Sequence, residues 1–396
     1  MDQERIDAFV KRNLRWNYVT LSCDWVLYVF ALSLISSSTV MPAFAERLGA
    51  SNLVIGAIPA AFTLGFFLPG IFSARHIERL PRKLPFLLRF TLWERVPPLA
   101  VALAALAFGR SQPLVVLVVL LLAVGSMATA SGTLWPGWLE LIAKVIPVQL
   151  RGRMLAYSGA LGALLGLGAS AVVGYFLEAF PFPLNYGLCF GAAFLAAMAS
   201  YAVVATTREY PLPSAKPAVG FGTYLRQVPA ILRRDREFTW FLVVRGCAFA
   251  GGLANGFFTA SALRDHHAAE WQVAAFTSCL LLGQTVGNSI LGYVGDRHGH
   301  RPVLGASVVT QVIANVVALA ATDVSAFYVV FALVGASNGA AMIANGNLAL
   351  EYADEANRPT YVALATSIVS PLVVLTPLLG GFLADHLGYS PVFALA

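Results

Sequence analysis

Charged residues are scarce in this chain. Asp, Glu, Lys and Arg make up 12% of its 396 residues, whereas 58% are hydrophobic. Soluble domains carry about 25% charged residues, and the mean hydropathy of +0.73 is high. The composition therefore excludes an ordinary water-soluble protein.

The chain also lacks the side-chain patterns of enzymes. Its six histidines lie in expected loops or at helix ends, and none has metal-ligand spacing to a cysteine or carboxylate. A glycine-rich phosphate loop is missing, which argues against ATP-driven transport. We expect no enzymatic activity, no cofactor and no metal site.

Cysteine is rare as well. All four cysteines lie inside apolar runs, where such residues are usually small buried hydrophobic side chains. We therefore predict no disulfide or metal framework from them. They are Cys23, Cys189, Cys247 and Cys279.

Long apolar runs are abundant instead. Each is close to the ~20 residues with which a helix spans a bilayer, and they are too long for barrel strands. They predict an all-α membrane protein. We place the runs at about 17–44, 52–73, 84–108, 114–139, 154–177, 186–205, 238–263, 272–295, 302–321, 326–349 and 360–384.

The distribution of basic residues indicates topology. If the N-terminus is cytoplasmic and the runs alternate, only Arg47, Arg110 and Arg264 fall on the outer side. Such a bias is typical of cytoplasmic loops and predicts a multi-pass protein of the cytoplasmic (inner) membrane with its N-terminus in the cytoplasm. The net charge of +6 is therefore a topology signal, and we expect no nucleic-acid partner.

The two halves of the chain resemble each other. Gly125-Ser126 matches Gly335-Ala336, and Leu139-Glu140 matches Leu350-Glu351 at similar spacing. This pattern predicts two six-helix bundles related as a parallel repeat. The expected domains are 1–205, a cytoplasmic linker at 206–237 and 238–396. The second copy stops where its last helix begins, so we expect most of a twelfth helix to be missing from the chain.

A charged, glycine-punctuated link, GYVGDRHGHR, runs from Gly292 to Arg301. A degraded copy, GIFSARHIER, occupies 70–79 in the first half, with Ala74 where the second copy has Asp296. Each copy joins two apolar runs.

The later link resembles the loop motif of the major facilitator superfamily, with His300 in place of one arginine. The LPRK and AKVIP segments, at 80–83 and 143–147, resemble a bacterial permease branch of that superfamily. The resemblance implies a 12-helix fold and alternating access. However, the expected fourth helix lacks the arginine of proton-driven exporters, and the fifth lacks the proline of drug antiporters, which weighs against a drug–proton antiporter.

The resemblance and the repeat also imply a cytoplasmic gate. Asp296 can accept hydrogen bonds at a helix N-terminus, and repeat symmetry points it at the helix that begins near Arg153. The alternative is a positive-inside turn with an incidental acid. The gate residues are Gly292, Asp296, Arg297, Gly299, Arg301 and Arg153.

Four charges fall within apolar runs. Asp24 and Arg245 lie on helices that line the cavity in this superfamily, and are candidates for substrate or proton binding; a static ion pair is the alternative. Glu94 and Arg95 lie on a helix that is usually peripheral, so we predict a structural charge pair. Unpaired charges at mid-bilayer cost ~2.5–3.5 kcal/mol, so all four need a partner or a cavity.

Other candidate cavity residues are polar or aromatic. Asn side chains bind sugar-like or amide groups and Trp stacks on rings, but both also serve interhelical packing. These residues are Trp135, Trp138, Asn338, Asn345 and Asn347.

We therefore expect a monomeric secondary transporter in the lipid bilayer, with a small-molecule substrate and the proton as coupling ion. Proton-coupled export is the first choice. An uptake symporter, with Arg245 binding an anionic group, is the second. A non-transporting sensor or scaffold on the same fold is the third.

Overall fold

In a computed structural model, the structure describes residues 3–78, 80–211, 235–351 and 369–396, and within these ranges it contains helices and no strands. The chain groups into two compact units. The first comprises Met1–Ile35 and Leu64–Pro217, and the second comprises Ser36–Thr63 and Ala218–Ala396. The predicted domain limits differ by the segment Ser36–Thr63, which packs with the second unit; the predicted linker lies mostly outside the described residues.

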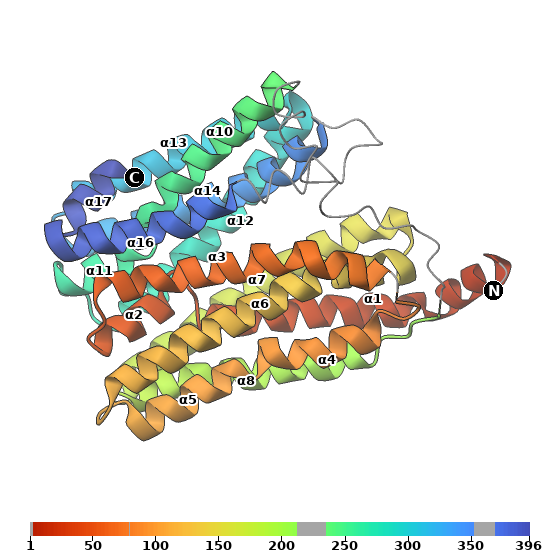
Figure 1. Cartoon of the computed structure of the whole chain (residues 1–396), viewed down its shortest axis with the longest axis horizontal. Coiled ribbons are helices and arrows are strands. Elements are labelled where there is room, and N and C mark those ends of the chain that lie inside the picture. Colours follow the sequence, from red (N-terminus) through yellow and green to blue (C-terminus); the bar gives the residue numbers. More distant parts are fainter. Residues whose placement is uncertain (1–2, 79, 212–234, 352–368) are drawn as a thin grey trace. The chain divides into compact units, whose positions relative to one another are not determined.

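The first unit is a bundle whose helices run side by side (Figure 1). It contains α1 (Gln3–Leu34), the later part of α3 (Asn52–Glu78), α4 (Leu84–Arg95), α5 (Pro97–Phe108), α6 (Pro113–Val145), α7 (Val148–Ala179) and α8 (Leu184–Ala205). Helix α1 packs against α7 and α8, and α4 packs against α6 and α8.

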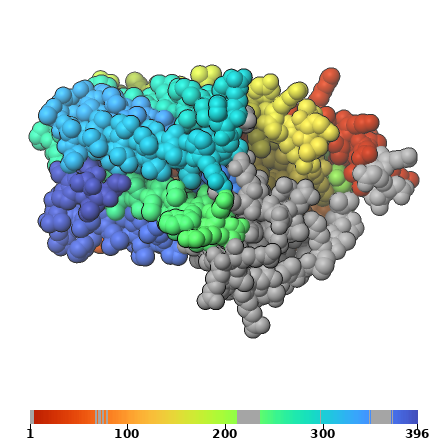
Figure 2. All heavy atoms as spheres, turned by 90° about the horizontal axis from the view of Figure 1, so that it is seen from above, coloured from red at the N-terminus to blue at the C-terminus, as the bar shows by residue number. Residues whose placement is uncertain are grey.

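The second unit contains α2 (Val40–Arg47), the start of α3, α10 (Arg236–Gly251), η1 (Gly252–Ala254), α11 (Phe257–Arg264), α12 (Gln272–His298), α13 (His300–Leu319), α14 (Ser325–Glu351), α16 (Ser370–Leu387) and α17 (Tyr389–Leu395). Helix α14 packs against α12 and α13. Helices α13 and α17 also touch, and they lie side by side on the face in Figure 2.

Membrane spans recur along both units. Within the described residues, nine helices or helix pairs are long and apolar enough to cross a membrane. The other two predicted runs coincide with shorter apolar helices, Asn52–Phe66 and Pro371–Leu387. The prediction of an α-helical, multi-pass membrane protein is therefore confirmed.

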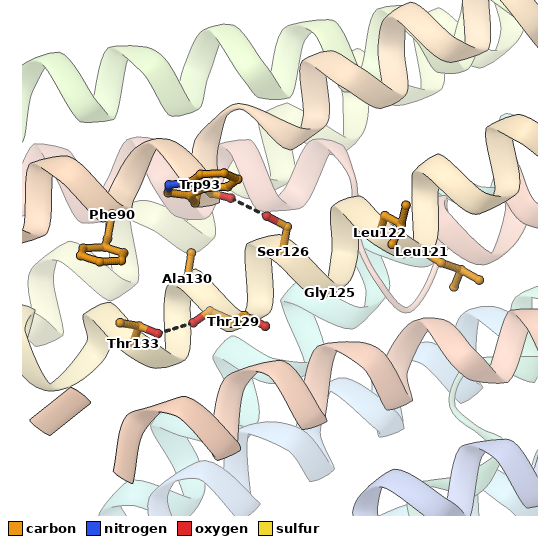
Figure 3. Close-up of a pocket in the computed structure, with 9 residues that line it drawn as sticks. All are labelled: Phe90, Trp93, Leu121, Leu122, Gly125, Ser126, Thr129, Ala130 and Thr133. Carbon is orange, nitrogen blue, oxygen red and sulfur yellow. Dashed lines mark hydrogen bonds between the residues drawn. The ribbon is translucent and has the colours of Figure 1, made fainter. Parts of the chain in front are cut away.

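The span from 84 to 108 is broken at a pair of prolines. Helix α4 ends at Arg95 and α5 begins at Pro97, because proline has no N–H with which to continue the helical ladder. The carbonyl of Trp93 therefore has no helical hydrogen bond, because the residue four positions later, Pro97, has no N–H group. The hydroxyl of Ser126 on α6 donates to that carbonyl at 3.1 Å (Figure 3), so the break is satisfied by a neighbouring helix.

Glycine allows α12 and α14 to approach closely. A Cβ atom at Gly335 would lie 2.0 Å from the carbonyl oxygen of Leu280, and one at Gly283 would lie 1.9 Å from that of Ala332. Membrane helices use small residues in this way because van der Waals packing drives their association.

The repeat provides a matched test of this packing. Gly335→Ala should destabilise the protein by about 1–3 kcal/mol, because the new methyl group meets backbone that cannot easily yield. Its repeat partner Gly125 has no atom within 4 Å of such a Cβ, so Gly125→Ala should leave thermal unfolding in detergent unchanged or improved. Equal effects of the two variants would contradict this account.

Candidate functional site

Asp24 and Arg95 form a buried ion pair in the first unit. The Nη2 atom of Arg95 on α4 donates to Oδ1 of Asp24 on α1 at 2.9 Å, and the two residues are 4% and 3% exposed. Two further donors reach the Asp24 carboxylate, Oγ of Ser200 on α8 at 2.6 Å and Nε1 of Trp138 on α6 at 3.1 Å. Four helices therefore meet at one carboxylate.

Glu94 extends this pair into a network. One of its carboxylate oxygens accepts from the Tyr28 hydroxyl at 2.7 Å and from the Ser131 hydroxyl. The other lies 3.6 Å from Nη1 of Arg95. The guanidinium group also stands over the Tyr28 ring, 4.7 Å from its centroid. We call Asp24, Arg95, Glu94, Tyr28 and Ser131 the coupling network.

The coupling network holds unequal charges. With all three groups ionised, two carboxylates face one guanidinium, which leaves a formal excess of one negative charge. Arg95 still has capacity to donate, since its buried Nε and Nη1 atoms make no hydrogen bond. The Asp24 carboxylate accepts three hydrogen bonds from side chains, whereas Glu94 accepts only from two hydroxyl groups.

An aromatic cluster adjoins Asp24. The rings of Trp135 and Trp138 stack at 5.7 Å with 18° between their planes, and Trp25 lies 5.1 Å from Trp138. Both predicted tryptophans therefore lie beside the buried pair, and Trp138 bonds to it directly. The sequence did not single out Trp25, Tyr28, Ser131 or Ser200.

Arg245 lies in the second unit, on α10, and is 6% exposed. Its guanidinium group stands 5.7 Å from the centroid of the Phe249 ring, and its Nε has no hydrogen-bond partner. Among the described residues it has no ion-pair partner. Asp24, in the first unit, pairs with Arg95, so the predicted Asp24–Arg245 pair stays a prediction.

The predicted asparagines have different surroundings. Asn338 is exposed on α14, whereas Asn345 is partly buried, with its Oδ1 unpartnered. The side chain of Asn347 lies outside the described residues.

The predicted cytoplasmic gate spans the junction of α12 and α13. Gly299 has φ +82°, a left-handed conformation that lets one helix end and the next begin at once. Arg301 pairs with Glu237 on α10, and Arg297 stacks 4.4 Å from the Tyr293 ring centroid. Arg153 is exposed in the first turns of α7, and Gly292 packs near Ile343. The Asp296 side chain lies outside the described residues, so its latch stays a prediction.

A polar cluster not predicted from the sequence fixes the start of α3 within the second unit. The two carboxylate oxygens of Asp385 accept from the N–H groups of Asn52 and of the residue after it, at 2.7 and 3.0 Å. The hydroxyl of Tyr389 donates to Oδ1 of Asn52 at 2.6 Å. Arg264 donates to the same oxygen at 3.2 Å and pairs with Glu46. We call these five residues the outer cluster, from their predicted side of the membrane.

Residues 246–396 match the family model of the Major Facilitator Superfamily. The whole chain also has the fold of solved structures from transporters. The second half of the chain thus resembles the major facilitator superfamily, and the chain has a fold that solved transporters share. A variant of the nucleoside transporter NupG aligns with a TM-score of 0.75 and 11% identity, covering 96% of this chain and 95% of that one. A search of curated proteins gives no significant match.

Two other solved structures share this fold. A bacterial homolog of the human lysosomal transporter Spinster aligns with a TM-score of 0.66 and 16% identity over 97% of this chain and 83% of its own. A D-xylose–proton symporter aligns with a TM-score of 0.65 and 12% identity, over 96% of this chain and 93% of its own. Identities this low establish the fold and not the substrate. The partial family match and the shared fold agree with the multi-pass helical architecture described above.

Loss of Arg95 should be costly for the stability of this protein. Arg95→Gln leaves the buried Asp24 carboxylate without its cation, and such losses destabilise by about 3–5 kcal/mol. Adding Asp24→Asn should recover part of the loss, because both charges are then gone. Unfolding in detergent measures both effects. Arg12→Gln is the control, since Arg12 is exposed on α1 and its loss should change stability by less than about 0.5 kcal/mol. Additive effects of the two buried substitutions would contradict the pairing.

Proposed function

We propose that this protein is a secondary active transporter of the cytoplasmic membrane that exports a small molecule in exchange for protons. The observation that carries the proposal is the coupling network, two carboxylates and one guanidinium buried within membrane-spanning helices. Ionisable residues at such depth usually mark ion or substrate pathways.

Glu94 is the proton carrier in this proposal. Asp24 is held by the close Arg95 contact and by two other donors, so its protonation would break several bonds. Glu94 lies farther from the guanidinium, and its hydroxyl partners can reverse from donor to acceptor when the acid gains a proton. Protonation of Glu94 also removes the excess negative charge. Asp24, the candidate favoured by the sequence, instead fixes Arg95.

The substrate side of the proposal rests on the aromatic cluster. Three indole rings beside Asp24 offer flat surfaces, and Nε of Arg95, which makes no hydrogen bond, offers a donor. A polar solute that contains a ring fits both features. The similar structures include transporters named for nucleosides and for xylose, which are solutes of this kind.

The second candidate is an uptake symporter for an anionic solute. It is favoured by Arg245, whose buried guanidinium group has no ion-pair partner among the described residues. A carboxylate or phosphate on the solute would supply the missing charge.

Proton coupling is tested in proteoliposomes that contain a pH-sensitive dye. Nucleosides, pentoses and planar organic cations are first screened by thermal shift, and any stabilising compound is then added. We expect compound-dependent proton flux in the wild type and its loss in Glu94→Gln, while binding is retained because the neutral amide still accepts from Tyr28.

The direction of flux separates export from uptake. Opposed movement of solute and protons supports export, and parallel movement supports the symporter. Binding without any proton flux would favour a sensor, and retained proton coupling in Glu94→Gln would exclude that residue as carrier.

Alternating access is tested with two variants that should shift the protein in opposite directions, one in the outer cluster and one in the predicted cytoplasmic gate. Thr277 is 1% exposed on α12 and hydrogen-bonds to Thr39 at 2.6 Å, so Thr277→Cys in a cysteine-free background reports opening on the predicted outer side. Asp385→Asn removes a carboxylate that caps α3 and should speed labelling by an impermeant thiol reagent severalfold. Asp296→Asn should slow it, because the proposed latch favours the outward-facing state. Equal rates in all three proteins would contradict both gates.

A further inference from the structure

Three cavities follow one another along the surface-exposed face of α4. The first, of ≈350 Å³, lies at the helix start and shares Pro85 with the second, of ≈740 Å³. The second shares Phe90 and Trp93 with the third, of ≈420 Å³ (Figure 3). Adjacent cavities share lining residues and follow the same helix, and we call the three together the α4 groove.

The wall of the α4 groove is a single helical stripe. Phe86, Arg89, Phe90 and Trp93 follow the i, i+3, i+4, i+7 spacing of one helix face. Trp93 is 66% exposed and Phe90 is 36% exposed. Arg95, on the opposite face, and Glu94, at the flank of the stripe, are buried in the coupling network. An exposed aromatic stripe on a membrane-spanning helix is a surface for lipid, since hydrocarbon surrounds it.

The predicted cytoplasmic end of the groove is basic. Arg82 and Arg208 line the first cavity. Arg208 is held in position because its Nη1 donates to Asn13 at 3.0 Å and its guanidinium group stacks 5.3 Å from the centroid of the Trp16 ring. The remaining nitrogens of Arg208 are left for an anion.

The one acid in that cavity, Glu209, is already neutralised. Its carboxylate accepts from the backbone N–H groups of Lys83 and Leu84 at 2.7 and 2.9 Å, and from Nζ of Lys144 at 2.8 Å. Glu209 thus caps α4 and leaves the two arginines to set the charge of the cavity.

We propose that the α4 groove is a binding site for one anionic phospholipid of the cytoplasmic leaflet. Arg82 and Arg208 hold the phosphate, Arg89 adds a third positive charge, and an acyl chain lies over Phe90 and Trp93 into the third cavity. The dimensions agree: the ten residues of α4 from Leu84 to Trp93 rise about 14 Å at ~1.5 Å per residue, close to half of a ~30 Å hydrocarbon core. Basic pockets beside membrane helices on this side bind anionic head groups.

Tryptophan quenching by brominated lipids tests the site in the full chain. The protein is reconstituted into phosphatidylcholine vesicles that contain a minor fraction of either brominated phosphatidylglycerol or brominated phosphatidylcholine. We expect the anionic lipid to quench more strongly, and Trp93→Phe to remove the difference because Trp93 contacts the bound chain. Equal quenching by the two lipids would show ordinary surrounding lipid only and overturn the proposal.

The head-group contacts are tested by charge removal. Arg82→Gln with Arg208→Gln should weaken the preference for phosphatidylglycerol, by roughly fivefold for each charge. Both residues are exposed, so the variant should fold, and a thermal unfolding curve checks this. The matched control is Arg236→Gln, an exposed arginine at the start of α10 that lines none of the three cavities. A preference unchanged by the double substitution, or lost equally in the control, would overturn the assignment.

Discussion

The first unit is organised around the ion pair between Asp24 and Arg95. A charge left alone at mid-bilayer costs ~2.5–3.5 kcal/mol, so each of these residues requires the other. The pair connects α1 with α4, and the hydrogen bonds from Ser200 and Trp138 add α8 and α6. The Asp24 carboxylate therefore fixes how four helices pack, because its donors come from three helices other than its own.

Hydropathy and the positions of basic residues were enough to predict the fold class, because a bilayer tolerates few backbone solutions. The buried site was predicted only in part. Asp24, Glu94, Arg95 and Trp138 stand out as polar or aromatic groups within apolar runs, but their connections depend on which helices touch. Arg95 reaches Asp24 where the proline pair breaks the helix, and sequence spacing does not reveal that geometry. Tyr28, Ser131 and Ser200 carried no signal, since hydroxyl groups are common in membrane helices.

Helix α4 has two chemically distinct faces. Glu94 and Arg95 point into the coupling network, whereas Phe86, Arg89, Phe90 and Trp93 line the α4 groove. The break after Arg95 is held by a single side-chain hydrogen bond, from Ser126 to the Trp93 carbonyl. The backbone carbonyl of Trp93, a residue of the α4 groove, thus accepts a hydrogen bond from α6. The same helix carries Ser131, which donates to Glu94. The proposed proton site and the proposed lipid site therefore share one short helix.

The chain directly after α8 belongs structurally to the first unit. Arg208 exchanges two hydrogen bonds with Asn17 through its backbone, Glu209 caps α4, and Tyr210 donates to the carbonyl of Lys144. These residues lie within the stretch that the sequence marks as a linker. A first half that stopped at the end of α8 would therefore lose the carboxylate that caps α4.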